Sequence, residues 1–82
     1  MNYREIYLWG RSGLEKAGIM EFELDARLLL EFICHTNRNT LFVHDDREVT
    51  EEEEHRYREA IAMRSSRIPL QHITGVQEFM GL

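Results

Sequence analysis

Cysteine, proline and lysine each occur only once in this chain of 82 residues, and long hydrophobic runs are missing. The single cysteine, Cys34, has no second cysteine with which to form an internal disulfide, which is typical of a reducing, cytoplasmic compartment. No run approaches the roughly 18 apolar residues of a membrane-spanning helix, and residues 1–5 do not begin an apolar signal-peptide core. We therefore expect a cytoplasmic protein that does not contact a membrane.

Positive charge is also scarce, because 15 acidic residues outnumber 10 basic ones and give a net charge of −5. Nucleic-acid-binding domains owe most of their affinity to lysine and arginine side chains on phosphates. A DNA-recognition helix would have to be basic, whereas the segment after Thr50 begins with four glutamates. We therefore expect no direct contact with nucleic acid.

The motifs of common enzyme sites are absent from the sequence. It contains no Gly-x-Gly-x-x-Gly, no phosphate-binding loop and no Gly-x-Ser-x-Gly. The four histidines are widely spaced, and the adjacent Cys34 and His35 point to different sides of a helix, so neither supplies metal-ligand spacing. The sequence predicts no catalytic, cofactor-binding or metal-binding residue in this chain.

Helical periodicity is the main positive signal. The first helix is indicated by an apolar stripe with spacings of three and four residues, formed by Tyr3, Ile6, Tyr7, Gly10, Leu14 and Ala17. A glycine on this stripe costs helix stability, so we expect another helix to pass close to Gly10. Gly18 is predicted to end the helix in a left-handed conformation.

The second predicted helix runs from Glu21 to Thr36 and is the most apolar segment. It is expected to be the central helix, with an inner face made by Phe22, Ala26, Leu28, Leu29, Phe32 and Ile33. Asp25 lies next to this face, where we expect it to cap a nearby backbone group or to meet an arginine. Cys34 is expected to be a buried thiol.

Three shorter predictions complete the fold. Residues 41–43 are expected to form a short helix that presses three apolar side chains onto the bundle. Thr50 and Glu53 form a capping box that starts a helix ending near Ile68, with an inner stripe of Tyr57, Ala60 and Ile61 and with Met63 as a further candidate. Pro69 opens a last helical turn that Gly75 ends, and Val76–Leu82 is expected to begin a β-strand.

The predicted fold class is thus all-α, a small bundle of four to five helices with a short extended C-terminal segment. Partner-binding candidates are few. Trp9 lies at the edge of the first helix, where core packing and an interface anchor are both open interpretations. A second group is predicted beside the end of the bundle, either as a solvated helix end or as a contact surface: Arg64, Arg67, Gln71, His72 and Thr74.

The C-terminal part of the sequence resembles a known family. Residues 64–75, Arg-Ser-Ser-Arg-Ile-Pro-Leu-Gln-His-Ile-Thr-Gly, are followed by Glu-Phe-Met-Gly-Leu at 78–82. These segments resemble the N-terminal region of the PrmC/HemK protein-(glutamine-N5) methyltransferases. Two upstream segments share the resemblance, Leu-Asp-Ala-Arg-Leu-Leu-Leu at 24–30 and His-Asp-Asp-Arg-Glu-Val-Thr at 44–50. His72 stands where that family more often has tyrosine.

The resemblance implies a two-domain enzyme. Residues 1–75 would be its N-terminal helical bundle, which recognises the substrate, and residues 76–82 would start a β-hairpin that links it to a Rossmann-like catalytic domain. That domain would bind S-adenosylmethionine and methylate the glutamine of the Gly-Gly-Gln motif in peptide chain release factors, the proteins that act in translation termination. The expected partners are a release factor and the catalytic domain, and this chain alone would bind no cofactor and transfer no methyl group.

A second hypothesis comes from another functional class. The chain would then be a self-standing helical protein-interaction adaptor with no connection to methylation. The two hypotheses differ in the gene sequence that follows residue 82, where the first requires a glycine-rich loop and an Asn-Pro-Pro-Tyr motif.

Overall fold

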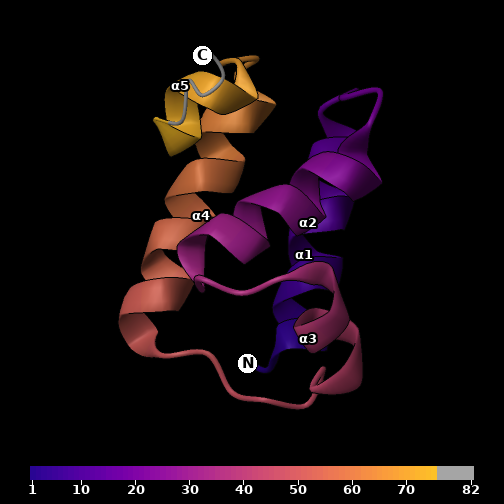
Figure 1. Ribbon diagram of the computed structural model, residues 1–82. Helices are drawn as coiled ribbons and strands as arrows, with labels where there is room; N and C mark the ends of the chain where they lie inside the picture. The colour runs from indigo at the N-terminus through magenta and orange to yellow at the C-terminus, as the bar shows by residue number, and fades with distance from the viewer. Residues whose placement is uncertain (76–82) are drawn as a thin grey trace.

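The computed structural model describes residues 1–75, and in this range the chain forms five α-helices. They are α1 (Tyr3–Lys16), α2 (Phe22–Ile33), α3 (Arg38–Val43), α4 (Glu51–Ser65) and α5 (Leu70–Thr74). In Figure 1, α3 lies near the beginning of α1, and α5 lies at the end of α4, on the opposite side of the molecule. The predicted all-α fold is confirmed. The strand predicted at 76–82 lies outside the described residues.

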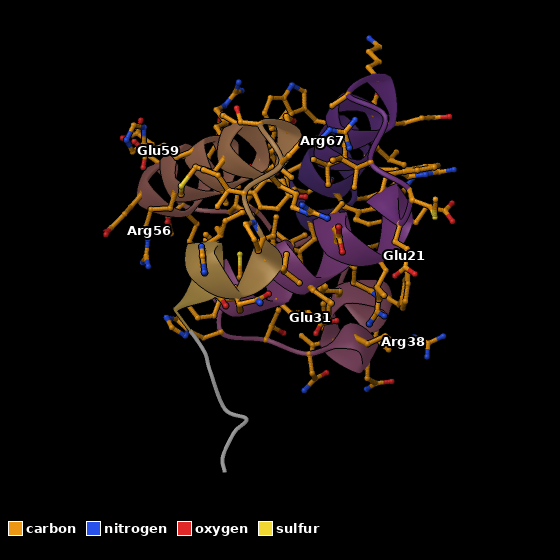
Figure 2. All side chains as sticks on the ribbon, turned by 90° about the horizontal axis from the view of Figure 1, so that it is seen from above. Glu21, Glu31, Arg38, Arg56, Glu59 and Arg67 are labelled. Carbon is orange, nitrogen blue, oxygen red and sulfur yellow. The ribbon has the colours of Figure 1, made fainter. Side chains whose placement is uncertain are left out.

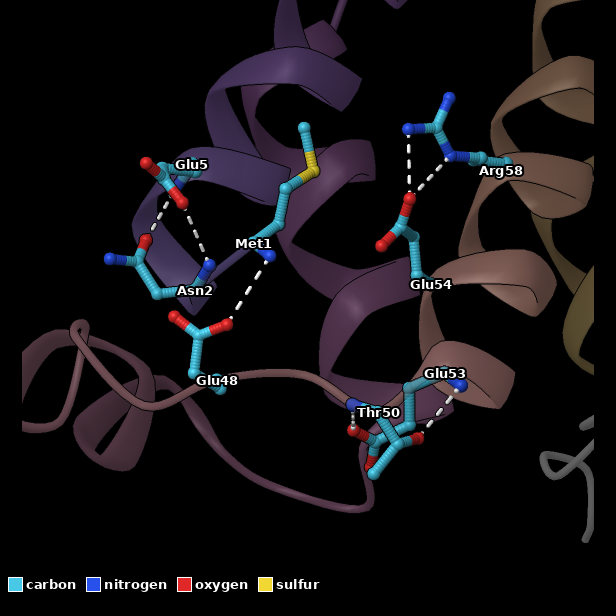
Figure 3. A network of polar contacts seen from close by, with 8 residues as sticks. All are labelled: Met1, Asn2, Glu5, Glu48, Thr50, Glu53, Glu54 and Arg58. Carbon is cyan, nitrogen blue, oxygen red and sulfur yellow. Dashed lines mark hydrogen bonds and ion pairs between the residues drawn. The ribbon is translucent and has the colours of Figure 1, made fainter.

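Side chains cap the starts of three helices. Thr50 and Glu53 form the predicted capping box at α4, with N···O distances of 3.0 and 2.9 Å. An equivalent box at α1 was not predicted from the sequence: Asn2 and Glu5 exchange hydrogen bonds of 2.8 and 3.0 Å (Figure 3). Asn37 accepts from the backbone N–H of Thr40 at the start of α3. Each cap satisfies backbone donors that a helix start leaves unpaired.

The ends of α1, α2 and α4 share one backbone motif. After α1, the N–H of Gly18 donates to Glu15 and the N–H of Ile19 to Leu14, with Gly18 at φ +81° as predicted. This is a Schellman motif, and the buried Leu14 and Ile19 supply its usual apolar pair. At α2 and α4 the left-handed position is taken by His35 and Arg67, at φ 52° and 71°.

The left-handed residue at His35 explains why one predicted boundary was wrong. The helix predicted to reach Thr36 ends at Ile33. The N–H groups of His35 and Thr36 instead donate to Phe32 and Glu31 and turn the chain away from the helix axis. No glycine marks the end of this helix, so the apolar pattern alone predicted a helix that is too long.

The core is centred on α2, as predicted. This helix packs against each of the other four described helices. Its buried residues are Asp25, Ala26, Leu29, Leu30 and Ile33, and they meet Tyr3, Ile6 and Leu14 from α1 and Tyr57, Ala60 and Ile61 from α4. Cys34 is buried, as expected.

The expected close approach at Gly10 is confirmed and involves Tyr57. A Cβ atom at Gly10 would lie only 2.8 Å from the ring carbons Cε2 and Cζ of Tyr57 and would also strike its hydroxyl oxygen. That hydroxyl is buried and donates to the carbonyl oxygen of Ala26 at 3.0 Å. Gly10 therefore makes room for a tyrosine that links α4 to α2.

Two predictions of burial were wrong. Of the three apolar residues in 41–43, only Leu41 is buried, while Phe42 and Val43 are 60% and 63% exposed. A helix as short as α3 turns one face inward and leaves its neighbours outside. Met63, the further candidate for the inner stripe of α4, is 37% exposed.

The connection between α3 and α4 is fastened to the N-terminus, which the sequence analysis did not foresee. Asn2 and Glu48 form an isolated antiparallel bridge, and the N–H groups of Tyr3 and Val49 donate to Arg47 and Met1 at 2.9 and 3.0 Å. The N-terminal ammonium lies 3.3 Å from the Glu48 carboxylate (Figure 3).

Candidate functional site

Five of the six predicted partner-binding residues lie close to the corner where α4 ends and α5 begins, and Arg64 is the most constrained of them. Its Nε donates to the carboxylate of Asp25 in α2 at 2.9 Å, and its Nη1 donates to the carbonyl oxygen of Ile68 at 3.2 Å. The Arg64 side chain is only 23% exposed and that of Asp25 10%. The expectation that Asp25 meets an arginine is confirmed, and Arg64 acts inside the fold.

Arg67 ties the same corner to the end of α1. Its Nη2 donates to the carbonyl oxygen of Ala17 at 3.2 Å. Figure 2 looks down on this region and shows Arg67 between the ends of α4 and α1. A guanidinium on the last carbonyls of a helix also faces the negative end of its dipole. Arg67 is exposed, but its hydrogen bond still helps to arrange the helices.

Helix α5 separates the remaining corner residues by face. Leu70 and Ile73 pack against the core from one side. Gln71 and His72 are exposed on the other. Thr74 is half-buried and engaged with its surroundings. The outward-facing polar groups of α5 are therefore those of Gln71 and His72.

Trp9 lies apart from this corner, on the seam between α1 and α4. It is 36% exposed, and its ring is tilted 56° against that of Tyr57 at a centroid distance of 6.4 Å. The guanidinium carbon of Arg58 lies 4.9 Å from the Trp9 ring centroid, and Arg58 also pairs with Glu54 at 2.9 Å. One part of the indole is packed, and the rest is available to a partner.

A surface hollow between α1, α2 and α3 was missed by the sequence analysis. It has a volume of about 250 Å³ and is lined by Tyr3, Arg4, Tyr7, Leu8, Arg27, Leu30, Leu41, Phe42 and Asp45. Leu8 is 46% exposed here. Its position beside Tyr7 and off the inner stripe of α1 was the available signal, but locating the hollow also required the placement of α3.

Burial favours the neutral forms of three core side chains, Tyr3, Cys34 and Tyr57. Burial raises the pKa of the Cys34 thiol to about 11, with a smaller contribution from Glu53. Burial likewise raises the pKa values of Tyr57 and Tyr3. Among residues 1–75, no group of histidine, cysteine and acidic side chains has the arrangement of a metal site. None of the helices in this range is long and apolar enough to cross a membrane.

Comparison with known proteins agrees with the predicted resemblance. The family profile described as PrmC N-terminal domain matches residues 5–75. A "Release factor glutamine methyltransferase" of Deinococcus radiodurans is 35% identical over 82 residues, all of this chain and 30% of that protein. A protein of the same description from Koribacter versatilis is 47% identical over 68 residues, 83% of this chain and 24% of that protein.

The chain therefore spans less than a third of the length of these relatives. No solved structure matches it. The family match covers all of α2, α3, α4 and α5 and nearly all of α1. On this evidence the chain belongs to the PrmC N-terminal domain family.

Proposed function

We propose that this chain is the N-terminal, release-factor-binding domain of a protein methyltransferase that methylates the glutamine of the Gly-Gly-Gln motif in peptide chain release factors. In this proposal residues 1–75 are the substrate-recognition domain. Residues 76–82 start the linker hairpin to a catalytic domain, which is the second partner of the bundle. The observation that carries the proposal is the family match over residues 5–75, together with relatives named for this activity.

Chemical reasoning supports a separate recognition domain. A glutamine amide is a weak nucleophile, so the enzyme gains most by holding it in line with the methyl donor. Contacts with the protein substrate far from the reacting amide supply binding energy for that orientation. They also exclude free glutamine, which offers the bundle nothing to bind.

The methyl donor of the full-length parent protein is proposed to be S-adenosylmethionine, and no residue of 1–75 is assigned to it. The hollow between α1, α2 and α3 does not fit this cofactor. It is largely apolar, and its arginines are already engaged in ion pairs, Arg4 with Asp45 at 3.3 Å and Arg27 with Glu31 at 2.9 Å. The cofactor site belongs, in this proposal, to the catalytic domain.

Two surfaces are proposed to contact the release factor. The first is the α4–α5 corner, where Gln71 and His72 are exposed and where Arg64, Arg67 and Thr74 are the other candidates. The second is the exposed part of Trp9, a residue type enriched in interface hot spots. The net charge of −5 argues for a protein partner and against nucleic acid. We place the parent protein in the cytoplasm, where release factors act.

Titration of residues 1–82 with a bacterial release factor tests this proposal. We expect saturable binding without methyl transfer, and we expect Trp9→Ala or the double change Gln71→Ala/His72→Ala to weaken it by about tenfold. Glu52→Ala is the matched control, because Glu52 is exposed at the far end of α4. The absence of binding would favour the self-standing adaptor, as would a gene that stops near Leu82.

A further inference from the structure

Arg64 joins three parts of the molecule through one side chain. It belongs to α4, its Nε donates to Asp25 in α2 at 2.9 Å, and its Nη1 donates to the Ile68 carbonyl oxygen at 3.2 Å. Ile68 lies in the turn that leads from α4 into α5. The planar guanidinium fixes the angle between its donors, so Arg64 relates the direction of this turn to the central helix.

Apolar packing alone defines the direction of α5 poorly. The helix has five residues and no fully buried side chain, and Leu70 and Ile73 are its contacts with the core. Hydrophobic contact is non-directional, so two partly buried side chains leave room for a short helix to rotate or slide. Hydrogen bonds depend on distance and angle, and the bond from Arg64 to Ile68 constrains the turn that leads into α5.

The small net stability of a buried ion pair also indicates that the Asp25–Arg64 pair serves to orient the chain. Asp25 is 7% exposed on the inner side of the central helix. Removing two charges from water offsets most of their attraction, so a buried pair adds little stability over apolar residues of similar size. A bond to a turn carbonyl, by contrast, specifies where the chain goes next. The second tie, from Arg67 to Ala17, holds the same corner to α1.

We propose that Asp25 and Arg64 are positioning residues that set the direction of α5. Through α5 they set the orientation in which the bundle and the catalytic domain together receive the release factor. This inference rests on the function proposed above, because α5 carries the chain from the bundle toward residue 76.

The first test uses the chain of 82 residues itself. The double variant Asp25→Leu/Arg64→Met keeps the volume of the corner and removes both charges. We expect it to melt at or above the temperature of the unchanged chain, whereas residual dipolar couplings of the α5 amides show a changed direction relative to α2 and α4. Unchanged couplings in this variant would overturn the inference.

The chain offers a matched control for that experiment. Arg27 and Glu31 form another partly buried ion pair at 2.9 Å, with side chains 23% and 18% exposed, but both residues lie in α2. The variant Arg27→Met/Glu31→Leu likewise removes one positive and one negative charge, but from within a single helix. We expect its α5 couplings to match those of the unchanged chain. A change in the α5 couplings as large as in the first variant would show that loss of charge in general, and not loss of the Arg64 hydrogen bonds, reorients α5.

The second test uses the full-length parent. With Asp25→Leu/Arg64→Met, we expect the KM for an intact release factor to rise about tenfold, equivalent to ~1.4 kcal/mol of binding, with the effect in KM and not in kcat. An unchanged KM would refute the link to the reaction. A parent protein without residues 1–75 separates the two proposals, because an unchanged KM in that truncated enzyme refutes the recognition function itself.

Discussion

Substituting alanine for Gly10 tests the packing of the bundle most sharply. The alanine Cβ would lie 2.8 Å from two ring carbons of Tyr57, which is closer than van der Waals contact allows. Either the tyrosine ring or the α1 backbone would have to move. The ring is fully buried, and its hydroxyl donates to the Ala26 carbonyl at 3.0 Å. Alanine at position 10 must therefore displace Tyr57 and disturb this hydrogen bond.

The expected change in the free energy of unfolding is the sum of two destabilising contributions and one stabilising contribution. Overpacking costs about 1–3 kcal/mol, and leaving a buried oxygen unpaired costs about 1–3 kcal/mol. Replacing glycine by alanine inside a helix returns about 1 kcal/mol. We expect Gly10→Ala to lower the free energy of unfolding by about 1–5 kcal/mol, out of a total of about 4–12 kcal/mol for a domain of this size.

Gly13 supplies the control on the same helix. A Cβ there would meet Ile61 Cγ2 at 3.5 Å, an ordinary contact, so Gly13→Ala should stabilise the chain by about 0.5–1 kcal/mol. Urea denaturation followed by circular dichroism measures both variants. A Gly10→Ala variant as stable as the unchanged chain would contradict the predicted overlap with Tyr57. Tyr57→Phe, which removes the nearest atom, should make Gly10→Ala less destabilising.

The remaining predictions concern single positions. His35→Gly should raise the free energy of unfolding by about 1 kcal/mol, because His35 occupies a left-handed position at φ 52°; lower stability in urea would contradict this. Thr50→Ala should lower it by about 1 kcal/mol through loss of the α4 cap, and an unchanged denaturation midpoint would count against that role. Burial raises the pKa of Cys34 from 9.0 to about 11, so stability should fall as pH rises from about 9 to 11, when the unfolded chain loses its thiol proton first. Cys34→Ala should flatten the beginning of that fall in a pH series, and an identical profile would refute the assignment.

Local chemistry explains which parts of the fold were predictable. The Thr50 box and the Gly18 stop depend on residues within one turn of each other, and the backbone geometry that each needs is visible in its residue type. The stops at His35 and Arg67 use the same geometry without glycine. Pro69 indicated the second stop, which was predicted near Ile68 although α4 ends at Ser65, whereas no local residue marked the first. The helical spacing of apolar residues predicted that α2 is the central helix but did not locate its last turn.

Exposure and pairing across the molecule were harder to predict, because both depend on tertiary placement. Phe42 and Val43 look as apolar as Leu41, and only the position of α3 against α2 decides which of them is buried. Asp25 was expected either to cap a backbone group or to meet an arginine, and the sequence offered nine arginines. The role of Arg64 emerges only when α2 and the turn at Ile68 come together. The resemblance identified the family, but the positions of the partner-binding candidates required the fold.

The most direct measurement of the central claim compares the full-length parent with a form that lacks residues 1–75. Both are assayed for methylation of an intact release factor and of a short peptide that contains Gly-Gly-Gln. If the bundle recognises the substrate, its removal raises the KM for the intact factor by at least about tenfold and leaves the KM for the peptide nearly unchanged. Equal KM values for the intact factor in the two forms would contradict a role of this domain in substrate recognition.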